Sequence, residues 1–212
     1  MLHARVTLSW CVSLLLERLT QRVRPGSSLK PPDDWRRRAA VAAVLHDEPA
    51  GPRVLLMKRT ERVGDPWSGH ISLPGGRFDK RDDDLLATAI RETREELGIE
   101  LVGARLLGNL PTLSPLSAGP SGMEVTPFVF MTTEPVEPQL SAEAAAAFWL
   151  PIETAMSGAL DDLYTYPGPS MEGPGPAPGP GIVRQFPSWR YEGHVIWGLT
   201  FRILAELLAL TR

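Results

Sequence analysis

Cysteine is almost absent: the 212 residues include only Cys11. A single thiol excludes an internal disulfide and the paired thiolates of a zinc cluster. The fold must therefore be held by its own packing. This cysteine content favours a reducing compartment, and we expect a cytoplasmic location.

Long apolar runs are also missing. The run Leu8–Leu16 is too short to cross a bilayer as a helix, and Glu17 and Arg18 follow it where a signal peptide would carry small residues. We expect residues 4–23 to form an amphipathic helix that covers the domain or joins a partner in a homodimer, without stable membrane insertion. Residues 1–30 would then hold this helix and a linker, and residues 31–212 one globular domain.

A strong charge imbalance is absent as well. The net charge is −3 and the sequence pI is about 5.8, which argues against a protein held on nucleic acid by a broad basic face. Hydrophobic residues make up 43% and charged residues 22% of the chain, as in an ordinary soluble fold.

The sequence does contain short strand and helix patterns in mixed order. Strands are expected at four places: 39–47, 52–60, 104–110 and 125–133. The loop 61–72 is also expected to lead into a strand, which ends at Leu73-Pro74-Gly75-Gly76. Helices are expected in two later segments: 141–160, as pieces around a Phe-Trp-Leu-Pro turn, and 194–210. Because no regular strand–helix–strand alternation is visible, the pattern predicts an α+β fold with a mixed sheet between helices.

Proline marks two special places in this order. Pro127 lies within an expected strand, and since proline cannot donate to a ladder, it predicts an edge position for that strand. Residues 167–181 are almost all proline, glycine and small residues, so they lack the side chains of a core and read as an insertion.

A further helix is expected between Asp84 and Gly98. Acidic residues precede it as caps, and Gly98 ends it. Its apolar residues follow spacings of four, three and four, which predicts a core-facing stripe. The stripe consists of Leu86, Ile90, Thr93 and Leu97.

The same helix carries three glutamates, Glu92, Glu95 and Glu96, at spacings that place them on one face. Like charges at such spacings destabilise a helix by about 0.2–0.5 kcal/mol per pair. A hard divalent cation reverses that effect, because Mg²⁺ prefers carboxylate oxygens and completes its shell with water or phosphate. The alternative is a solvated acidic face that Arg91 and Arg94 neutralise.

The residues around the glutamates favour the metal. Gly75 and Gly76 let the backbone approach a ligand and can offer a carbonyl oxygen. Arg91 can hold a carboxylate in its planar fork. The whole segment resembles the signature of the Nudix hydrolases, which it matches at these positions: Gly76, Arg91-Glu92, Glu95-Glu96, Gly98 and Ile99. It departs at Asp82, where the family usually has glutamate, and the interval from Asp82 to Arg91 is one residue longer than the common form.

The resemblance implies the Nudix α/β/α sandwich and hydrolysis of a nucleoside diphosphate linked to another moiety. It implies Mg²⁺ as cofactor, with Mn²⁺ as a substitute, and a small nucleotide as substrate. The implied ligands are Glu92 and Glu96, assisted by Glu95 and the Gly76 carbonyl. Arg91 would orient a glutamate. The general base stays open between Glu92, Glu124 and Glu143, and the implied catalytic residues are Arg91, Glu92, Glu95 and Glu143.

Upstream and within the box, the chain is also similar to coenzyme A diphosphatases. The matching positions are Leu55, Leu56, Arg59, Gly69, Pro74-Gly75-Gly76, Arg77, Asp79 and Thr88-Ala89. The chain departs from that pattern at Asp65, where an arginine is usual, and at Met57 and Leu73. Asp65 removes a cation that would meet the phosphates of coenzyme A. ADP-ribose, a dinucleoside polyphosphate or an oxidised nucleotide therefore stay open, as does a regulatory domain that binds nucleotide without hydrolysis.

Four residues outside the glutamates are candidates for substrate contact: Arg59, Trp67, His70 and Arg77. Arg59 could meet a phosphate or form a surface salt bridge. Trp67 could stack on a base or cap the core, and His70 could be a hydrogen-bonded strand residue. Trp189 and Trp197 are expected in the core.

Overall fold

The computed structural model describes residues 31, 37–65, 67–115, 122–166 and 184–210. The expected N-terminal helix of residues 4–23 and the insertion at 167–181 lie outside the described residues. No helix among the described residues is long and apolar enough to cross a membrane.

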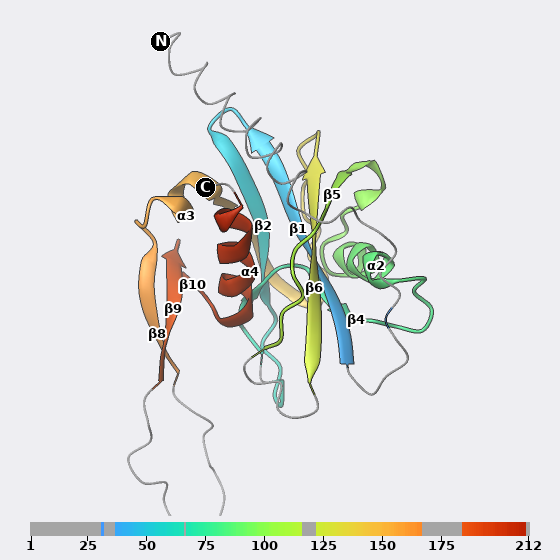
Figure 1. The fold of residues 1–212 in the computed structure, drawn as a ribbon, viewed down its shortest axis with the longest axis horizontal. Helices are drawn as coiled ribbons and strands as arrows, with labels where there is room; N and C mark the ends of the chain where they lie inside the picture. Colours follow the sequence, from blue (N-terminus) through green and yellow to red (C-terminus); the bar gives the residue numbers. More distant parts are fainter. Residues whose placement is uncertain (1–30, 32–36, 66, 116–121, 167–183, 211–212) are drawn as a thin grey trace, which may run out of the picture.

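The main sheet is mixed, as expected (Figure 1). β1 runs parallel to β6 and antiparallel to β2 and β4. The other pairings are antiparallel: β2 with β3 and β7, and β5 with β6. Among the described residues this sheet has seven strands: β1 (Arg37–Glu48), β2 (Gly51–Arg59), β3 (Ile71–Ser72), β4 (Gly75–Arg77), β5 (Arg105–Asn109), β6 (Met123–Thr132) and β7 (Ala144–Pro151).

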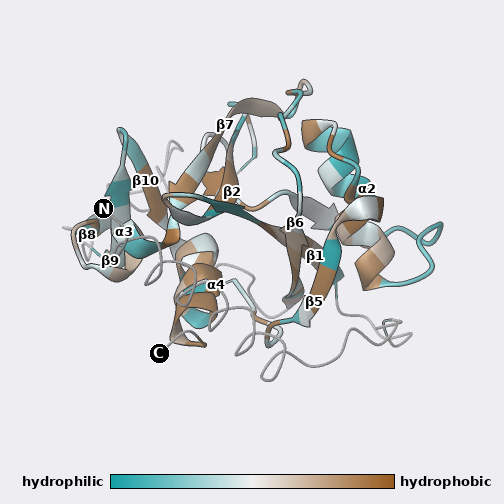
Figure 2. Cartoon of the chain, turned by 90° about the horizontal axis from the view of Figure 1, so that it is seen from above, coloured by the Kyte–Doolittle hydropathy of each residue, from teal (hydrophilic) through white to brown (hydrophobic). Residues whose placement is uncertain are grey.

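Two helices cover opposite faces of this sheet, as Figure 2 shows: α2 (Leu85–Leu97) and α4 (Gly198–Ala209). The alternation of the strands explains the two layers. In β1, Ala43 and Leu45 join the core under α4, whereas Ala42 and Val44 join the core under α2. Strands buried on both faces are apolar at nearly every position. The predicted α/β/α sandwich is therefore confirmed.

A small second sheet lies beside α4. It consists of β8 (Asp161–Tyr166), β9 (Arg184–Tyr191) and β10 (His194–Trp197), all antiparallel. Neither β8 nor β9 is predicted from the sequence. The last helix was expected to begin at residue 194, but residues 194–197 form β10. Trp189 is buried, as expected, and Trp197 is half-buried.

The helix expected at the start of 141–160 is wrong. Residues 144–151 form β7, which pairs with β2 from Arg53–Pro151 to Arg59–Ala144. Alanine has a high helix propensity, but propensity is a weak preference that tertiary pairing overrides. Only the later part of the segment is helical, as α3 (Ile152–Met156).

The edge position expected for the strand with Pro127 is also wrong. β6 is central, between β1 and β5. The Pro127 carbonyl accepts a hydrogen bond from the Leu110 N–H (2.9 Å), so the proline nitrogen faces the same side, beyond the last β5 pair, Asn109–Phe128. The N–H that Pro127 lacks would therefore lie beyond the last residue pair of β5 and β6, so the hydrogen bonds between these strands do not need it.

Candidate active site

The three glutamates of α2 are not equivalent. Only 3% of the Glu96 side chain is exposed, compared with 16% for Glu92 and 52% for Glu95. The expected apolar stripe is rotated accordingly: Thr93 and Leu97 are buried, whereas Leu86 and Ile90 are only partly buried. Glu92 and Glu96 thus turn towards the protein, and Glu95 turns outward.

Gly75 places its backbone against Glu96. Its N–H donates to Oε2 of Glu96 at 2.8 Å. Gly75 has φ +151°, a value that L residues rarely adopt, and a Cβ there would lie 2.5 Å from the Cα of Val41. Glycine is therefore required for β4 to lie against β1 while donating to Glu96.

Gly76 leaves room for the Glu92 carboxylate. A Cβ at Gly76 would lie 2.5 and 2.6 Å from the two carboxylate oxygens of Glu92. Gly76 pairs with Ala40 in the register of β4 with β1. Backbone hydrogen bonds join the two strands two residues before and two residues after this pair, so Gly76 and Ala40 also form a hydrogen-bonded pair. The Gly76 carbonyl therefore faces the Ala40 N–H. A carbonyl oxygen has a second lone pair, which stays available to a ligand.

Arg91 connects the helix to the preceding loop. Its Nε and Nη2 donate to the two oxygens of Asp82 at 2.8 and 2.9 Å, and Nη1 donates to Glu92 at 2.8 Å and to Glu95 at 3.1 Å. The bidentate fork thus holds Asp82, which also accepts from Thr88 Oγ1 at 2.8 Å. These hydrogen bonds from Arg91 keep the pKa of the Asp82 carboxyl below its usual range.

Burial opposes the charge on the two inner glutamates. Desolvation raises the pKa of Glu96 to about 7; the Gly75 N–H and Arg59 counteract it, while the charges of Glu92 and Glu143 reinforce it. Desolvation also raises the pKa of Glu92, against the opposing effect of Arg91. The site therefore has less positive charge of its own than two ionised carboxylates require.

This donor set fits a hard divalent cation. Carboxylate oxygens from Glu92 and Glu96 and the carbonyl of Gly76 are the ligand types that Mg²⁺ prefers. Within the part of the chain that the structure describes, no three acidic, histidine or cysteine side chains stand close enough to hold a metal by themselves. Water and phosphate oxygens would have to supply the remaining positions, as is usual for Mg²⁺.

Two further candidates lie close to the glutamates. Arg59, at the end of β2, donates to Asp65 at 2.9 Å and stands 4.0 Å from Glu96. Glu143, just before β7, pairs with Arg62 at 3.2 Å, and its charge acts on both Glu92 and Glu96. The Arg59–Asp65 pair was missed from the sequence, although opposite charges six residues apart in one loop were a signal for it.

The other candidates point elsewhere or are held through the backbone. The His70 ring packs edge-on against Trp197 at 5.1 Å, and burial lowers its pKa. The Trp67 N–H donates to Asp65, and the carbonyl of the exposed Arg77 accepts from Arg91. Glu124 lies on β6, paired with Arg38 at 3.1 Å.

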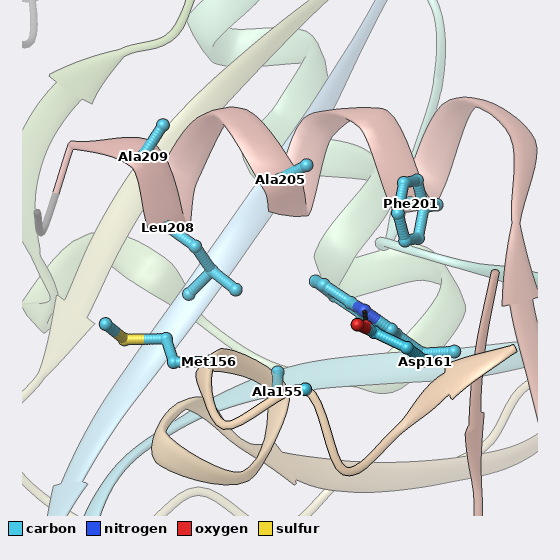
Figure 3. A pocket seen from close by; sticks show the side chains of 9 residues that line it. Ala155, Met156, Asp161, Phe201, Ala205, Leu208 and Ala209 are labelled. Atoms are coloured by element: carbon cyan, nitrogen blue, oxygen red, sulfur yellow. Dashed lines mark hydrogen bonds between the residues drawn. The ribbon is translucent and has the colours of Figure 1, made fainter. Parts of the chain in front are cut away.

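One cavity of about 230 Å³ lies away from these groups, between α3, α4 and β9 (Figure 3). Met156, Phe201 and Leu208 line it, together with Asp161, whose carboxylate accepts from Trp189 at 3.1 Å. It contains none of the glutamates of α2 and lies on the other side of the main sheet.

Buried helix glutamates that meet a glycine strand in an α/β/α sandwich form a site suited to a divalent cation. The family model described as NUDIX domain matches residues 36–169. The chain is 33% identical over 172 residues to the "Uncharacterized Nudix hydrolase NudL" of Yersinia pestis (strain Pestoides F), covering 81% of this chain and 78% of that protein. The match to the NudL of Yersinia pseudotuberculosis serotype O:1b has the same values. The chain therefore belongs to the Nudix hydrolase family.

Solved structures are similar at lower levels. The binary complex of a C. elegans Ap4A hydrolase has a TM-score of 0.48 and 24% identity, covering 57% of this chain and 84% of that one. The NUDIX domain of Shewanella oneidensis NrtR, complexed with ADP ribose, has a TM-score of 0.44 and 20% identity, covering 57% and 77%. The coenzyme A diphosphatase likeness stays a prediction.

Proposed function

We propose that the chain hydrolyses the diphosphate bond of coenzyme A or an acyl-coenzyme A with Mg²⁺, for which Mn²⁺ substitutes, in the cytoplasm. One observation carries the metal-dependent chemistry. Glu96 is a buried carboxylate that is anchored to the Gly75 N–H, beside Glu92 and without full charge compensation. A site of this kind gains most from a bound divalent cation.

Glu92 and Glu96 are the proposed ligands, with Glu95 and the Gly76 carbonyl assisting. The cation, when bound, neutralises the charge that develops on the phosphoryl oxygens. Arg91 keeps the Glu92 carboxylate oriented through its Nη1 bond and ties Glu92 to Asp82. Glu95, which shares the same Nη1, limits the rotation of Arg91.

Glu143 is the proposed general base, ahead of Glu92 and Glu124. Its charge acts on both inner glutamates, and half of its side chain is exposed, so water can reach it. Arg62 lies 3.2 Å from this carboxylate and helps to position it.

The substrate proposal rests on the resemblance around Pro74-Gly75-Gly76 and on the cationic and aromatic residues near it. Arg59 and Arg77 would meet phosphates. Trp67 stays a candidate for contact with the nucleoside, whereas the His70 ring packs on Trp197 and is the weaker candidate. Because Asp65 occupies Arg59, ADP-ribose, a dinucleoside polyphosphate and an oxidised nucleotide remain the competing substrates. A regulatory domain without catalysis is disfavoured, since all three glutamates are retained.

The test is a screen of nucleoside diphosphate derivatives with purified protein and Mg²⁺, in which released phosphomonoesters are read by phosphatase coupling. We expect coenzyme A to give 4′-phosphopantetheine and adenosine 3′,5′-bisphosphate faster than the other compounds give their products. Faster turnover of ADP-ribose or a dinucleoside polyphosphate would redirect the substrate assignment, and no turnover of any compound would favour the regulatory alternative.

A further inference from the structure

Arg59 stands between two carboxylates that belong to different elements. Its Nη2 donates to Oδ2 of Asp65 at 2.9 Å, whereas its Nη1 lies 4.0 Å from Oε1 of Glu96. The first distance is a hydrogen bond and the second is too long for one. The guanidinium is therefore bound to the loop and only near the helix.

The preference for Asp65 is unexpected on burial alone. Glu96 is 3% exposed and Asp65 is 20% exposed, so an ion pair with Glu96 would be less screened by water. The buried Nε of Arg59 has no hydrogen-bond partner among the described residues, so the guanidinium is not fully satisfied where it is. A restraint must hold it there.

The restraint is the turn that carries Asp65. Oδ1 of Asp65 accepts the Trp67 N–H at 3.0 Å, and its carbonyl accepts the Ser68 N–H at 3.0 Å. The carboxylate is thus fixed by its own loop and presents the other oxygen to Arg59. Without that oxygen, the nearest anionic partner for the guanidinium is Glu96.

A guanidinium on Glu96 would compete with any cation for the same carboxylate. We propose that Asp65 is a positioning residue that holds Arg59 away from Glu96 and so leaves the Glu96 carboxylate available to a divalent cation. This inference rests on the proposed role of Glu96 as a metal ligand. Asp65 lies outside the glutamate signature, and its effect is exerted entirely through Arg59.

Mn²⁺ binding to the full chain without substrate tests the inference, read as free Mn²⁺ by electron paramagnetic resonance at pH 8. In Asp65→Ala, the released guanidinium should weaken Mn²⁺ binding about tenfold. Arg59→Met should bind Mn²⁺ at least as tightly as the wild type. Asp65→Ala combined with Arg59→Met should return to the Arg59→Met value, because no guanidinium remains to move.

The Asp162–Arg190 pair of the second sheet, at 2.8 Å, is the matched control, and Asp162→Ala should leave Mn²⁺ binding unchanged. If Asp65→Ala yields little folded protein, Asp65→Asn replaces it, with the same direction expected, because the amide still accepts the Trp67 N–H but holds a cation less strongly.

Two results would overturn the role of Asp65 alone: Mn²⁺ affinity within twofold of wild type in folded Asp65→Ala, or a weakening that persists when Arg59→Met is added. A purely structural role of the turn predicts that persistence. A wild type that takes up no Mn²⁺, or an unaltered affinity in Glu96→Gln, would overturn the metal assignment together with this inference.

Discussion

When the Glu96 carboxyl ionises, it places a charge at a position that is nearly closed to water. The Gly75 N–H and Arg59 offset the cost of that charge only in part, because Glu92 and Glu143 add to it. In the metal-free protein, ionised Glu96 therefore opposes folding. A cation that binds only the folded state would offset this unfavourable free energy and stabilise the fold.

Glu96→Gln should separate function from stability. The amide oxygen can still accept the Gly75 N–H, so at pH 8 and without metal the variant should be more stable than wild type, on the order of 1–3 kcal/mol. Metal-dependent hydrolysis should fall at least about 100-fold, since a ligand to the cation is lost. Chemical denaturation with chelator and a steady-state assay measure the two effects, and unchanged turnover would contradict the ligand assignment.

The raised pKa of Glu96 also predicts how metal binding depends on pH. Between its ordinary pKa of 4.5 and its folded value of about 7, the folded state holds a proton that the unfolded state has lost. The metal-free protein thus has this contribution to stability in full below pH 4.5 and loses it as the pH rises through 7. A cation must displace the proton, so Mn²⁺ affinity should rise about tenfold per pH unit up to about pH 7 and then level off.

Calorimetry in two buffers of different ionisation enthalpy measures this release directly. About one proton should leave per cation bound at pH 6, and almost none at pH 8. An affinity that is constant from pH 5.5 to 8 would mean that Glu96 is not a ligand.

Much of the site could be predicted at the level of residues because its chemistry is local in the sequence. The spacing of Glu92 and Glu96 on one helix, and the glycines before it, follow from backbone geometry alone. Which glutamate is buried did not follow, because that depends on where β4 lies against α2. The Arg59–Asp65 pair also depends on the fold of a loop.

At the scale of elements, α2 is defined at both ends by its caps. The Asp84 side chain accepts the Ala87 N–H at 2.8 Å, and Gly98, at φ +65°, donates to the Arg94 carbonyl. The stop at Gly98 and an acidic N-terminal cap were predicted correctly, since capping depends on residues next to each other in the chain, although the sequence did not single out Asp84 among the three aspartates. The start of the helix is therefore a good place to test stability apart from catalysis.

Asp84→Ala should destabilise the protein by about 1 kcal/mol, which lowers the melting temperature by about 2–4 °C, because the first turn loses its side-chain acceptor. The rate constants with saturating Mg²⁺ should change less than twofold. Asp83→Ala removes the same charge from the exposed neighbouring residue and is the control. Equal effects of the two changes would show that charge rather than capping matters.

Elements that depend on distant partners were harder to predict. The alanines of β7 resemble a helix until β2 pairs with them, and Pro127 resembles an edge residue until the end of β5 is known. β8 and β9 carry few buried apolar residues, so their alternation is weak in the sequence. In each case, the structure is decided by contacts with residues that are far away in the sequence.

At the scale of the whole molecule, the chain between β8 and β9 begins and ends at two residues that pair with each other in the second sheet. Tyr166 pairs with Arg184, so the two ends of the intervening chain lie side by side. A short turn can join strands in this arrangement.

Replacing residues 167–183 by a short Asn-Gly turn should therefore preserve the fold and the Mg²⁺-dependent rate within about twofold. Thermal melting and the substrate screen measure both. A loss of turnover for one substrate, with melting unchanged, would instead assign this segment to substrate selection. Substitution of residues 168–170 by glycine and serine, at constant length, is the control for chain length.

β4 belongs to two networks at once: it pairs with β1, and through Gly75 it holds Glu96. Detaching β4 from Glu96 would also loosen its ladder with β1, where Ala42 donates to Pro74 at 2.8 Å. A transient local opening of the site should thus expose these amides to solvent. Deuterium uptake at the Ala40 and Ala42 amides should slow when a cation binds the glutamates. This measurement would therefore report cation binding even in a sample that shows no catalytic turnover.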